Sequence, residues 1–279
     1  MPNTDQIEYW NGEAGATWVT QAEALDSLLR EVGDAVIAHS KLKVGDSVLD
    51  IGCGSGALTL AAQARVGNTG QATGLDISKP LIQNAERRAG ERKSRALFRQ
   101  ADASTWRADE PVDAIVSRFG VMFFDDPTAA FANILQSIKP GGVLTFACWR
   151  SPKENDMGGG LMKAVSHLFT PPEVKPDPTA PGPFAFADQT YVSTFLDKAG
   201  WRDVNFTPWD GRLPLTGNNA QEVAGFLARM GPIGRVMREQ NVAVESVIDA
   251  LIPFLETRKQ NEAFALNGAV WIVTARRAA

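Results

Sequence analysis

The sequence has little of several residue types on which whole classes of protein depend. Its 279 residues include two cysteines, Cys53 and Cys148, and two histidines, His39 and His167. Their spacing fits neither a disulfide framework nor a zinc site, so we expect free thiols and no metal. The N-terminus lacks a basic segment followed by an apolar one, and no apolar run approaches the roughly 20 residues of a membrane span. These absences predict a cytoplasmic protein without a membrane span.

Positive charge is also not in excess. The chain has 28 Lys and Arg against 32 Asp and Glu, a formal net charge of −4, whereas nucleic-acid binders are usually basic. We therefore expect a small-molecule partner and no nucleic acid. The sequence is also compatible with a homodimer. One basic cluster is interpreted as a solvated helix face with no role at the site; its members are Arg87, Arg88, Arg92, Lys93, Arg95 and Arg99.

From Lys41 to Trp149 short apolar runs alternate with amphipathic helical stretches. This alternation is typical of parallel strands joined by crossover helices, and it predicts an α/β fold with a doubly wound, Rossmann-like, mostly parallel sheet. Asp126 before Pro127 marks one helix start, because an acidic cap is followed by a residue suited to the first turn. The expected strands are Ser47–Asp50, Gln71–Asp76, Ala96–Gln100, Val112–Ser117, Gly142–Cys148, Val204–Trp209 and Ala269–Ala275.

Three segments interrupt the alternation and predict the domain organisation. Residues 1–40 read as N-terminal lid helices, and the core over 41–150 is completed by 189–210 and 267–279. Residues 151–188 and 211–266 read as substrate cap insertions. The later, mainly helical cap is expected to have two or three helices, broken at Gly231-Pro232 and around Pro253.

The stretch Val48–Ala57 carries the most chemical information. It reads as a strand that ends in Asp50 and turns through Gly52, Gly54 and Gly56 into a helix. Glycines let a ligand approach the backbone closely, and the spacing Gly-x-Gly-x-x-Ala also satisfies the dinucleotide fingerprint. Asp50 favours a different cofactor, because a carboxylate there repels a pyrophosphate but suits an α-amino group and a sulfonium.

Acidic residues also end the next two predicted strands. Asp76 can accept hydrogen bonds from ribose hydroxyls, since Ser78 can cap the following helix instead. Ile77 would then lie beside an adenine. Asp102 can accept from the adenine amino group, and the alternative role of this residue is an N-cap before Ser104.

This constellation resembles the class I S-adenosylmethionine-dependent methyltransferases over about Lys41 to Trp149. Within that family the sequence is similar to the small-molecule branch that includes the ubiquinone and menaquinone type, and Ile138–Leu144 matches a fifth-strand motif. The resemblance implies S-adenosylmethionine as cofactor and a methyl transfer by in-line displacement. It implies cofactor contacts from Asp50, Gly52, Cys53, Gly54, Asp76, Ile77, Asp102, Ala103, Ser117 and Phe119, and from Trp10, Trp18 and Gln21 of the lid.

The acceptor is expected to be an apolar or aromatic small molecule held between the sheet and the caps. Phe119, Gly120, Met122 and Trp149 are the candidate contacts from the core, and core packing is the alternative role of Met122. The cap aromatic and Met candidates are Phe169, Phe184, Phe186, Phe226 and Met230.

No catalytic base stands out. His167 on the cap is the one candidate, and a surface or packing role is the alternative. Two other function classes stay open: a protein that binds S-adenosylmethionine without transferring the methyl, and an NAD-dependent oxidoreductase, which would have to accommodate Asp50.

Overall fold

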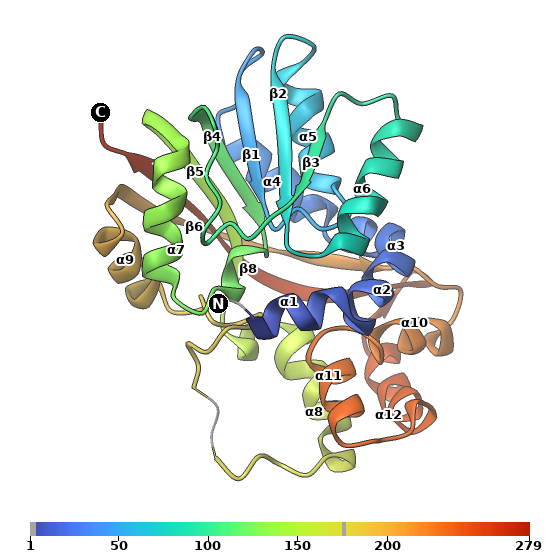
Figure 1. The fold of residues 1–279 in the computed structure, drawn as a ribbon. Coiled ribbons are helices and arrows are strands. Elements are labelled where there is room, and N and C mark those ends of the chain that lie inside the picture. Colours follow the sequence, from blue (N-terminus) through green and yellow to red (C-terminus); the bar gives the residue numbers. More distant parts are fainter. Residues whose placement is uncertain (1–3, 175–176) are drawn as a thin grey trace.

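One mixed sheet organises the chain, which a computed structural model describes over residues 4–174 and 177–279. The strand order is β3-β2-β1-β4-β5-β8-β6 (Figure 1). The short strand β7 pairs with β8. Strands β1 to β5 run parallel, and β8 is antiparallel to both β5 and β6. The strands are β1 (Ser47–Ile51), β2 (Gln71–Asp76), β3 (Leu97–Gln100), β4 (Val112–Arg118), β5 (Ile138–Trp149), β6 (Trp201–Leu215), β7 (Lys259–Gln260) and β8 (Ala263–Arg277).

Helices cover both faces of this sheet, as the alternating pattern predicted. In Figure 1, α7 and α9 lie together in front of the sheet, and α4 and α5 lie behind it. The helices that pack on the sheet or its edge are α4 (Arg30–His39), α5 (Ala57–Val66), α6 (Lys79–Glu91), α7 (Pro127–Ile134) and α9 (Gln189–Lys198). The predicted doubly wound, Rossmann-like fold is confirmed.

Capping side chains fix where these helices begin. The carboxylate of Asp126 accepts a hydrogen bond from the backbone N–H of Ala129 at 2.9 Å, directly before Pro127 in the first turn of α7. Asp188 does the same for Tyr191 N in α9. Such caps satisfy helix N–H groups that have no partner within the helix, so the expected start of α7 at Pro127 is confirmed.

The remaining helices lie at the lower edge of the sheet in Figure 1. Those of the N-terminal segment are α1 (Thr4–Asn11), α2 (Glu13–Thr20) and α3 (Ala22–Leu28). Those of the cap are α8 (Leu161–Val165), α10 (Ala220–Leu227), α11 (Gly231–Glu239) and α12 (Val244–Glu256). Residues 1–3 of the expected lid and 175–176 of the first expected cap lie outside the described residues. Within the described part of the chain, no helix is long and apolar enough to cross a membrane.

The structure corrects the expected extent of the cap helices over 211–266. Strand β6 continues to Leu215 and β8 begins at Ala263, because the two strands pair without interruption from Asn205 and Thr274 to Leu215 and Phe264. The helix break at Gly231 is confirmed, but α12 runs through Pro253. A proline near the end of a helix removes only one backbone hydrogen bond, which the packing of α12 against α10 can offset.

A cluster of aromatic rings holds α7 and α9 on the sheet. Phe131 of α7 is fully buried, and its ring lies 5.7 Å from that of Phe146 on β5 and 5.2 Å from that of Phe195 on α9. Phe124 and Phe186 complete its surroundings. One side chain therefore links the sheet, two helices and the end of the first expected cap segment.

We predict that Phe131→Ala lowers the free energy of unfolding by about 3–5 kcal/mol, the usual cost of removing a buried phenylalanine ring. Urea denaturation followed by circular dichroism measures the change. Leu97→Ala is the control, because this β3 side chain is 55% exposed, and its effect should stay within about 0.5 kcal/mol. Equal losses in the two variants would contradict the assignment of Phe131 to the structural centre.

Candidate functional site

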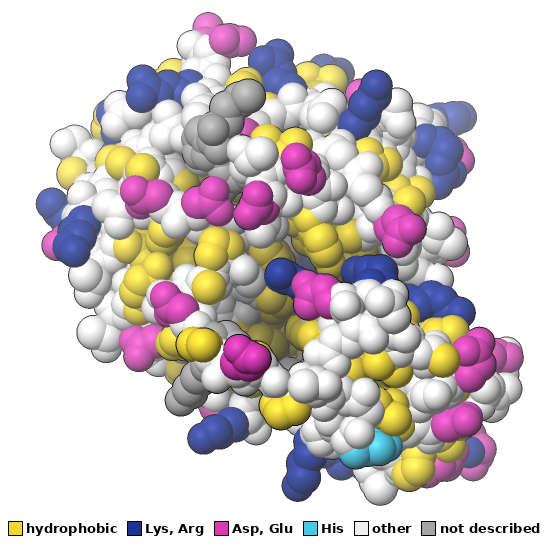
Figure 2. Space-filling model, turned by 60° about the horizontal axis from the view of Figure 1, so that its bottom comes forward, with side chains coloured by type: hydrophobic (Ala, Val, Ile, Leu, Met, Phe, Trp, Pro, Cys, Tyr) yellow, Lys and Arg dark blue, Asp and Glu magenta, His cyan; other side chains and the backbone are white. Residues whose placement is uncertain are grey.

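A cavity of about 210 Å³ lies at the carboxyl ends of the parallel strands. Its walls come from the turns after β1, β2, β3 and β4, from α1 to α3, and from the cap. Figure 2 shows a hollow with hydrophobic side chains around it on this side of the molecule. In open α/β sheets, ligands bind at this edge, where the strand order reverses, and here β1 lies between β2 and β4.

Two glycines bring the ends of β1 and β4 into backbone contact. A Cβ on Gly52 would lie 2.6 Å from the Cα of Gly120, closer than any side chain allows. Gly54, two residues further along the turn, differs: it has φ +53°, and a Cβ there would meet no atom within 4 Å. Gly54 therefore faces open space at the cavity wall, and the turn leaves its backbone accessible to a ligand.

Asp50 is a buried carboxyl group at the edge of this cavity. Its side chain is 1% exposed, and its Oδ2 accepts a hydrogen bond from Thr59 Oγ1 at 2.6 Å. Its Oδ1 has no partner among the described residues. Burial raises the pKa of Asp50 to about 7, although the Thr59 hydrogen bond and the Arg118 charge oppose that shift. A buried acceptor without a partner is costly, so this oxygen is suited to a donor supplied by a ligand.

Asp76 at the end of β2 is held by backbone amides. Its Oδ2 accepts from Gly54 N at 2.8 Å, and its Oδ1 accepts from Ser78 N at 2.9 Å. Burial raises the pKa of Asp76, and these amides oppose the increase. Ser78 does cap α6, as expected. The expectation that this cap would free Asp76 is wrong, because its carboxylate also fixes the glycine turn; each oxygen still keeps a second lone pair.

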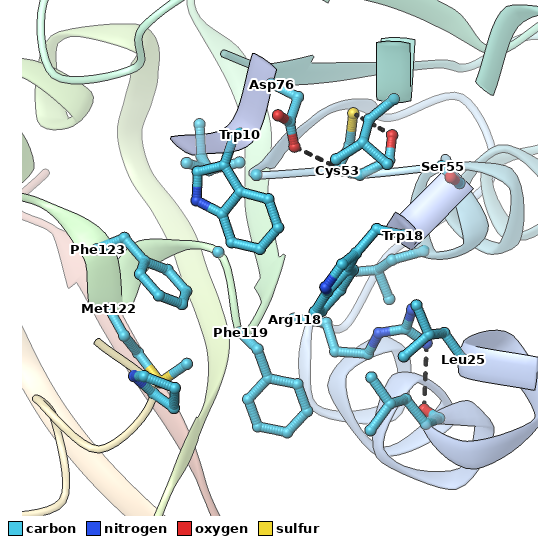
Figure 3. Close-up of a pocket in the computed structure, with 18 of the residues that line it drawn as sticks. Trp10, Trp18, Leu25, Cys53, Ser55, Asp76, Arg118, Phe119, Met122 and Phe123 are labelled. Carbon is cyan, nitrogen blue, oxygen red and sulfur yellow. Dashed lines mark hydrogen bonds between the residues drawn. The ribbon is translucent and has the colours of Figure 1, made fainter. Parts of the chain in front are cut away.

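The N-terminal helices are fastened to the turn that follows Asp76. Asn11 Nδ2 donates to Ile77 O at 3.1 Å, and Lys79 N donates to Asn11 Oδ1 at 2.9 Å. Ser78 Oγ donates to Trp10 O at 2.7 Å. This contact places Trp10 over the cavity, as Figure 3 shows.

Aromatic rings form much of the remaining wall. Trp10 meets Trp18 edge to face with ring centroids 5.2 Å apart, and it meets Phe123 in the same way at 5.8 Å. Phe119 stacks on Trp149 with centroids 4.2 Å apart. Figure 3 shows Trp10, Trp18, Phe119 and Phe123 around one space. Trp149 and Met122 also line it.

The cap contributes an apolar surface opposite the sheet. Of the five candidates, Phe184, Phe226 and Met230 line the cavity, together with Met157 and Pro232. Phe186 does not, because it packs against Phe131 and Phe195 in the core. Phe169 packs against the core cluster as well.

The structure brings most of the expected cofactor residues to one cavity. Asp102 lines it, and its Oδ1 accepts from Ser104 N within a turn. No helix begins between residues 101 and 111, so the alternative role of Asp102 as a helix N-cap is wrong. The sequence-predicted residues that line the cavity are Asp50, Gly52, Cys53, Gly54, Asp76, Ile77, Asp102, Ala103, Phe119, Gly120, Met122, Trp149, Trp10 and Trp18.

Besides Phe169 and Phe186 of the cap, three other expected site residues do not line this cavity. Gln21 follows the end of α2 and borders a separate depression with Phe226 and Arg229. Ser117 is buried in β4, and its hydroxyl donates to Ile51 O at 2.7 Å, so it links strands. His167 is exposed in a 3₁₀ turn (Ser166–Leu168) after α8, in agreement with the alternative surface role.

A charged cluster next to the glycine turn was not predicted from the sequence. Arg88 is only 5% exposed, forms an ion pair with Asp26 of α3 and donates to Ser55 O at 2.7 Å. Its interpretation as part of a solvated face is wrong, because it points from α6 into the molecule. Asp26 and Arg118 line the cavity. Arg118 directly follows Ser117 at a strand end, a position that could have identified it; no signal marked Asp26.

Cys53 is a packing residue. It is buried, its sulfur lies against Gly74, and burial raises the pKa of its thiol well above the usual value. A thiol of this kind is a poor nucleophile. Among residues 4–174 and 177–279, no group of three or more His, Cys, Asp or Glu side chains is arranged to hold a metal ion.

Part of this chain is similar to a known protein family. A family model described as "Methyltransferase domain" matches residues 48–142. The aklanonic acid methyltransferase DauC of Streptomyces sp. is 30% identical over 52% of this chain and 62% of its own length. The ubiquinone/menaquinone biosynthesis C-methyltransferase UbiE of Bdellovibrio bacteriovorus is 33% identical over 38% of this chain and 46% of its own. The chain thus spans about half the length of the curated relatives it matches.

The whole fold is shared with solved structures. The YcgJ protein from Bacillus subtilis aligns with a TM-score of 0.59 at 15% identity, over 90% of this chain and 99% of that one. The sequence resemblance stated above is therefore confirmed in its family and its fold. Residues 48–142 match the methyltransferase domain family, and the chain shares its α/β fold with the YcgJ protein.

Proposed function

We propose that this protein binds S-adenosylmethionine in the cavity and transfers its methyl group to an apolar or aromatic small molecule. The observation that carries the proposal is the pairing of Gly54, which faces open space, with Asp50 Oδ1, which is buried and has no partner among the described residues. The matched family and the names of two relatives support it.

The nucleoside end would be held by residues after β2 and β3. The backbone amides of Gly54 and Ser78 fix the Asp76 carboxylate, so its remaining lone pairs can accept from ribose hydroxyls without reorganisation. Ile77, Asp102 and Ala103 line the adjoining wall. An apolar side chain and an acceptor at neighbouring positions suit a purine, which has two apolar faces and a donor edge.

Asp50 favours S-adenosylmethionine over a dinucleotide cofactor. A pyrophosphate at the start of α5 would meet a buried carboxyl group that has no donor to offer when ionised. An ammonium group supplies the donor that Oδ1 lacks, and its charge favours the carboxylate form. The donor set therefore fits an α-amino acid end and disfavours NAD.

The cofactor supplies an electrophilic methyl group on a positively charged sulfur. This chain would hold the two reactants in place and keep water away from them. Trp10 and Trp18 cover the cavity on one side, while Phe119 and Trp149 line another side. Excluding water and holding an acceptor in line are large contributions to such a displacement. Met157, Phe184, Phe226 and Met230 from the cap present no charge, so an apolar or aromatic acceptor fits this wall.

We predict that Gly54→Val abolishes binding of S-adenosylhomocysteine, because the new side chain fills the space assigned to the cofactor. Isothermal titration of the full chain measures the affinity, and circular dichroism checks the fold. Gly141→Val is a matched control: Gly141 has φ +76° and open space around its Cβ, at the start of the sheet-pairing part of β5 far from the cavity lining.

Both valine variants incur a similar backbone strain of about 1–3 kcal/mol, so the free energy of unfolding should fall by a similar amount in each. A loss of binding should occur in Gly54→Val alone. Normal affinity in a folded Gly54→Val protein would contradict the placement of the cofactor along this turn.

We also predict that the affinity for S-adenosylhomocysteine falls as the pH is lowered through about 7. The pKa of Asp50 without ligand is about 7, so the carboxylate that attracts the ammonium is present above this pH and protonated below it. Well below the pKa, the association constant should fall by up to about tenfold per pH unit.

Asp50→Asn is the control for this profile, because it keeps the shape and the contact with Thr59 but cannot ionise. Its affinity should be lower and nearly independent of pH between about 5.5 and 7.5. The same pH profile in the variant and the wild-type protein would show that another group titrates.

The proposed activity is tested by incubating the protein with S-adenosylmethionine and a panel of phenols, quinols, aromatic polyketides and RNA oligonucleotides, and measuring S-adenosylhomocysteine release. We expect turnover with an apolar or aromatic compound, and none with Gly54→Val. Turnover only with RNA would overturn the acceptor class. Binding of the cofactor without turnover on any compound would favour a binding protein that transfers no methyl.

A further inference from the structure

A cluster of charged side chains lies beside the glycine turn and joins three elements far apart in the sequence. Asp26 of α3 pairs with Arg88 of α6, 62 residues away, and its Oδ1 lies 4.0 Å from an Nη of Arg118 at the end of β4. Arg88 also donates to Ser55 O. The N-terminal helices are thereby tied to the turn that forms the cavity wall.

The two arginines differ in how well their donors are occupied. Arg88 has an ion pair with Asp26 and a hydrogen bond to a carbonyl, and it does not line the cavity. Arg118 lines it. Among the described residues its guanidinium donates one hydrogen bond, to Leu29 O at 3.1 Å, and its distance to Asp26 exceeds hydrogen-bond length. A guanidinium carries five N–H donors, so Arg118 has donors left for a ligand.

Arg118 is largely buried, with a side chain that is 15% exposed. Figure 3 shows it next to Trp18 and Leu25, with its hydrogen bond drawn as a dashed line. A cation in such surroundings is costly unless it is paired. Because Asp26 already forms an ion pair with Arg88, it neutralises the charge of Arg118 only in part.

Asp50 completes the pattern from the same cavity wall. Its carboxyl group is close enough to Arg118 for the two charges to influence each other, and its Oδ1 has no partner among the described residues. A cationic group with spare donors thus lies near an anionic group with a spare acceptor. Their arrangement complements a ligand that bears a carboxylate and an ammonium on neighbouring atoms.

We propose that Arg118 binds the carboxylate of an α-amino acid group whose ammonium lies against Asp50. On the proposed function, on which this inference rests, that group is the amino acid end of S-adenosylmethionine. Arg118 is then the residue that recognises this end, because an arginine fork can bind a carboxylate through two parallel hydrogen bonds. Asp26 and Arg88 are positioning residues that hold α3 and the glycine turn around it.

The test compares two ligands that differ by one carboxylate: S-adenosylhomocysteine and its decarboxylated analogue, which keeps the amine. Isothermal titration of the wild-type chain should show that S-adenosylhomocysteine binds at least about tenfold tighter. In Arg118→Met this preference should shrink toward one, because the variant loses affinity mainly for the ligand with the carboxylate. Arg118→Lys should restore part of it.

Arg88→Lys and Arg202→Met serve as controls. Arg88 acts on the turn, so its variant should weaken both ligands alike and keep their ratio. Arg202 forms an exposed ion pair with Asp197, and its variant should change neither affinity. If Arg88→Lys instead weakened the binding of S-adenosylhomocysteine more than that of the decarboxylated analogue, Arg88 and not Arg118 would be the residue that recognises the carboxylate.

The wild-type measurement is informative even if Arg118→Met does not fold. Equal affinity of the wild-type protein for both ligands overturns the inference about Arg118 and leaves the proposed function standing. A preference that survives in a folded Arg118→Met protein also overturns it. Failure of the wild-type protein to bind S-adenosylhomocysteine at all contradicts the proposed function itself.

Discussion

The direct backbone contact between Gly52 and Gly120 is the constraint on which the cavity depends. With a Cβ on Gly52 only 2.6 Å from the Cα of Gly120, no larger residue fits at the junction of β1 and β4. The contact sets where the glycine turn leaves the sheet, so Gly54 faces the open space. It also directs Phe119, which has a left-handed φ of +63°, toward Trp149.

Around this contact, buried charges are compensated by groups from distant parts of the chain. Backbone amides of two turns hold Asp76, Thr59 holds one oxygen of Asp50, and Asp26 draws two arginines toward the turn. Because charges interact strongly in a poorly solvated site, each group restricts its neighbours. The same turn after β2 carries the contacts to Trp10 and Asn11, so the cavity wall and the helices that cover it are joined.

Local patterns were sufficient to predict the parallel half of the sheet and the acids at its strand ends. Apolar runs bounded by Asp50, Asp76 and Gly52 are short-range signals, and α7 begins at Pro127 as its cap indicated. The long antiparallel pair β6 and β8 was underestimated, because Gly211 and Pro214, which are unusual inside strands, follow the predicted end at Trp209; the proline is tolerated here because β6 is an edge strand. The ion pair between Arg88 and Asp26 was not predictable from the sequence either. Arg88 resembles its exposed neighbours in the sequence, and only the fold brings Asp26 close to it.

The most direct test of the account is a crystal structure of the full chain with S-adenosylhomocysteine. We predict a ligand whose ribose lies within hydrogen-bond distance, about 3.2 Å or less, of the Asp76 carboxylate. We predict its ammonium at the same range from Asp50 Oδ1, and its thioether between the glycine turn and the Phe119 ring. A ligand bound outside this cavity, or one that leaves Asp50 Oδ1 without a donor, would contradict the account.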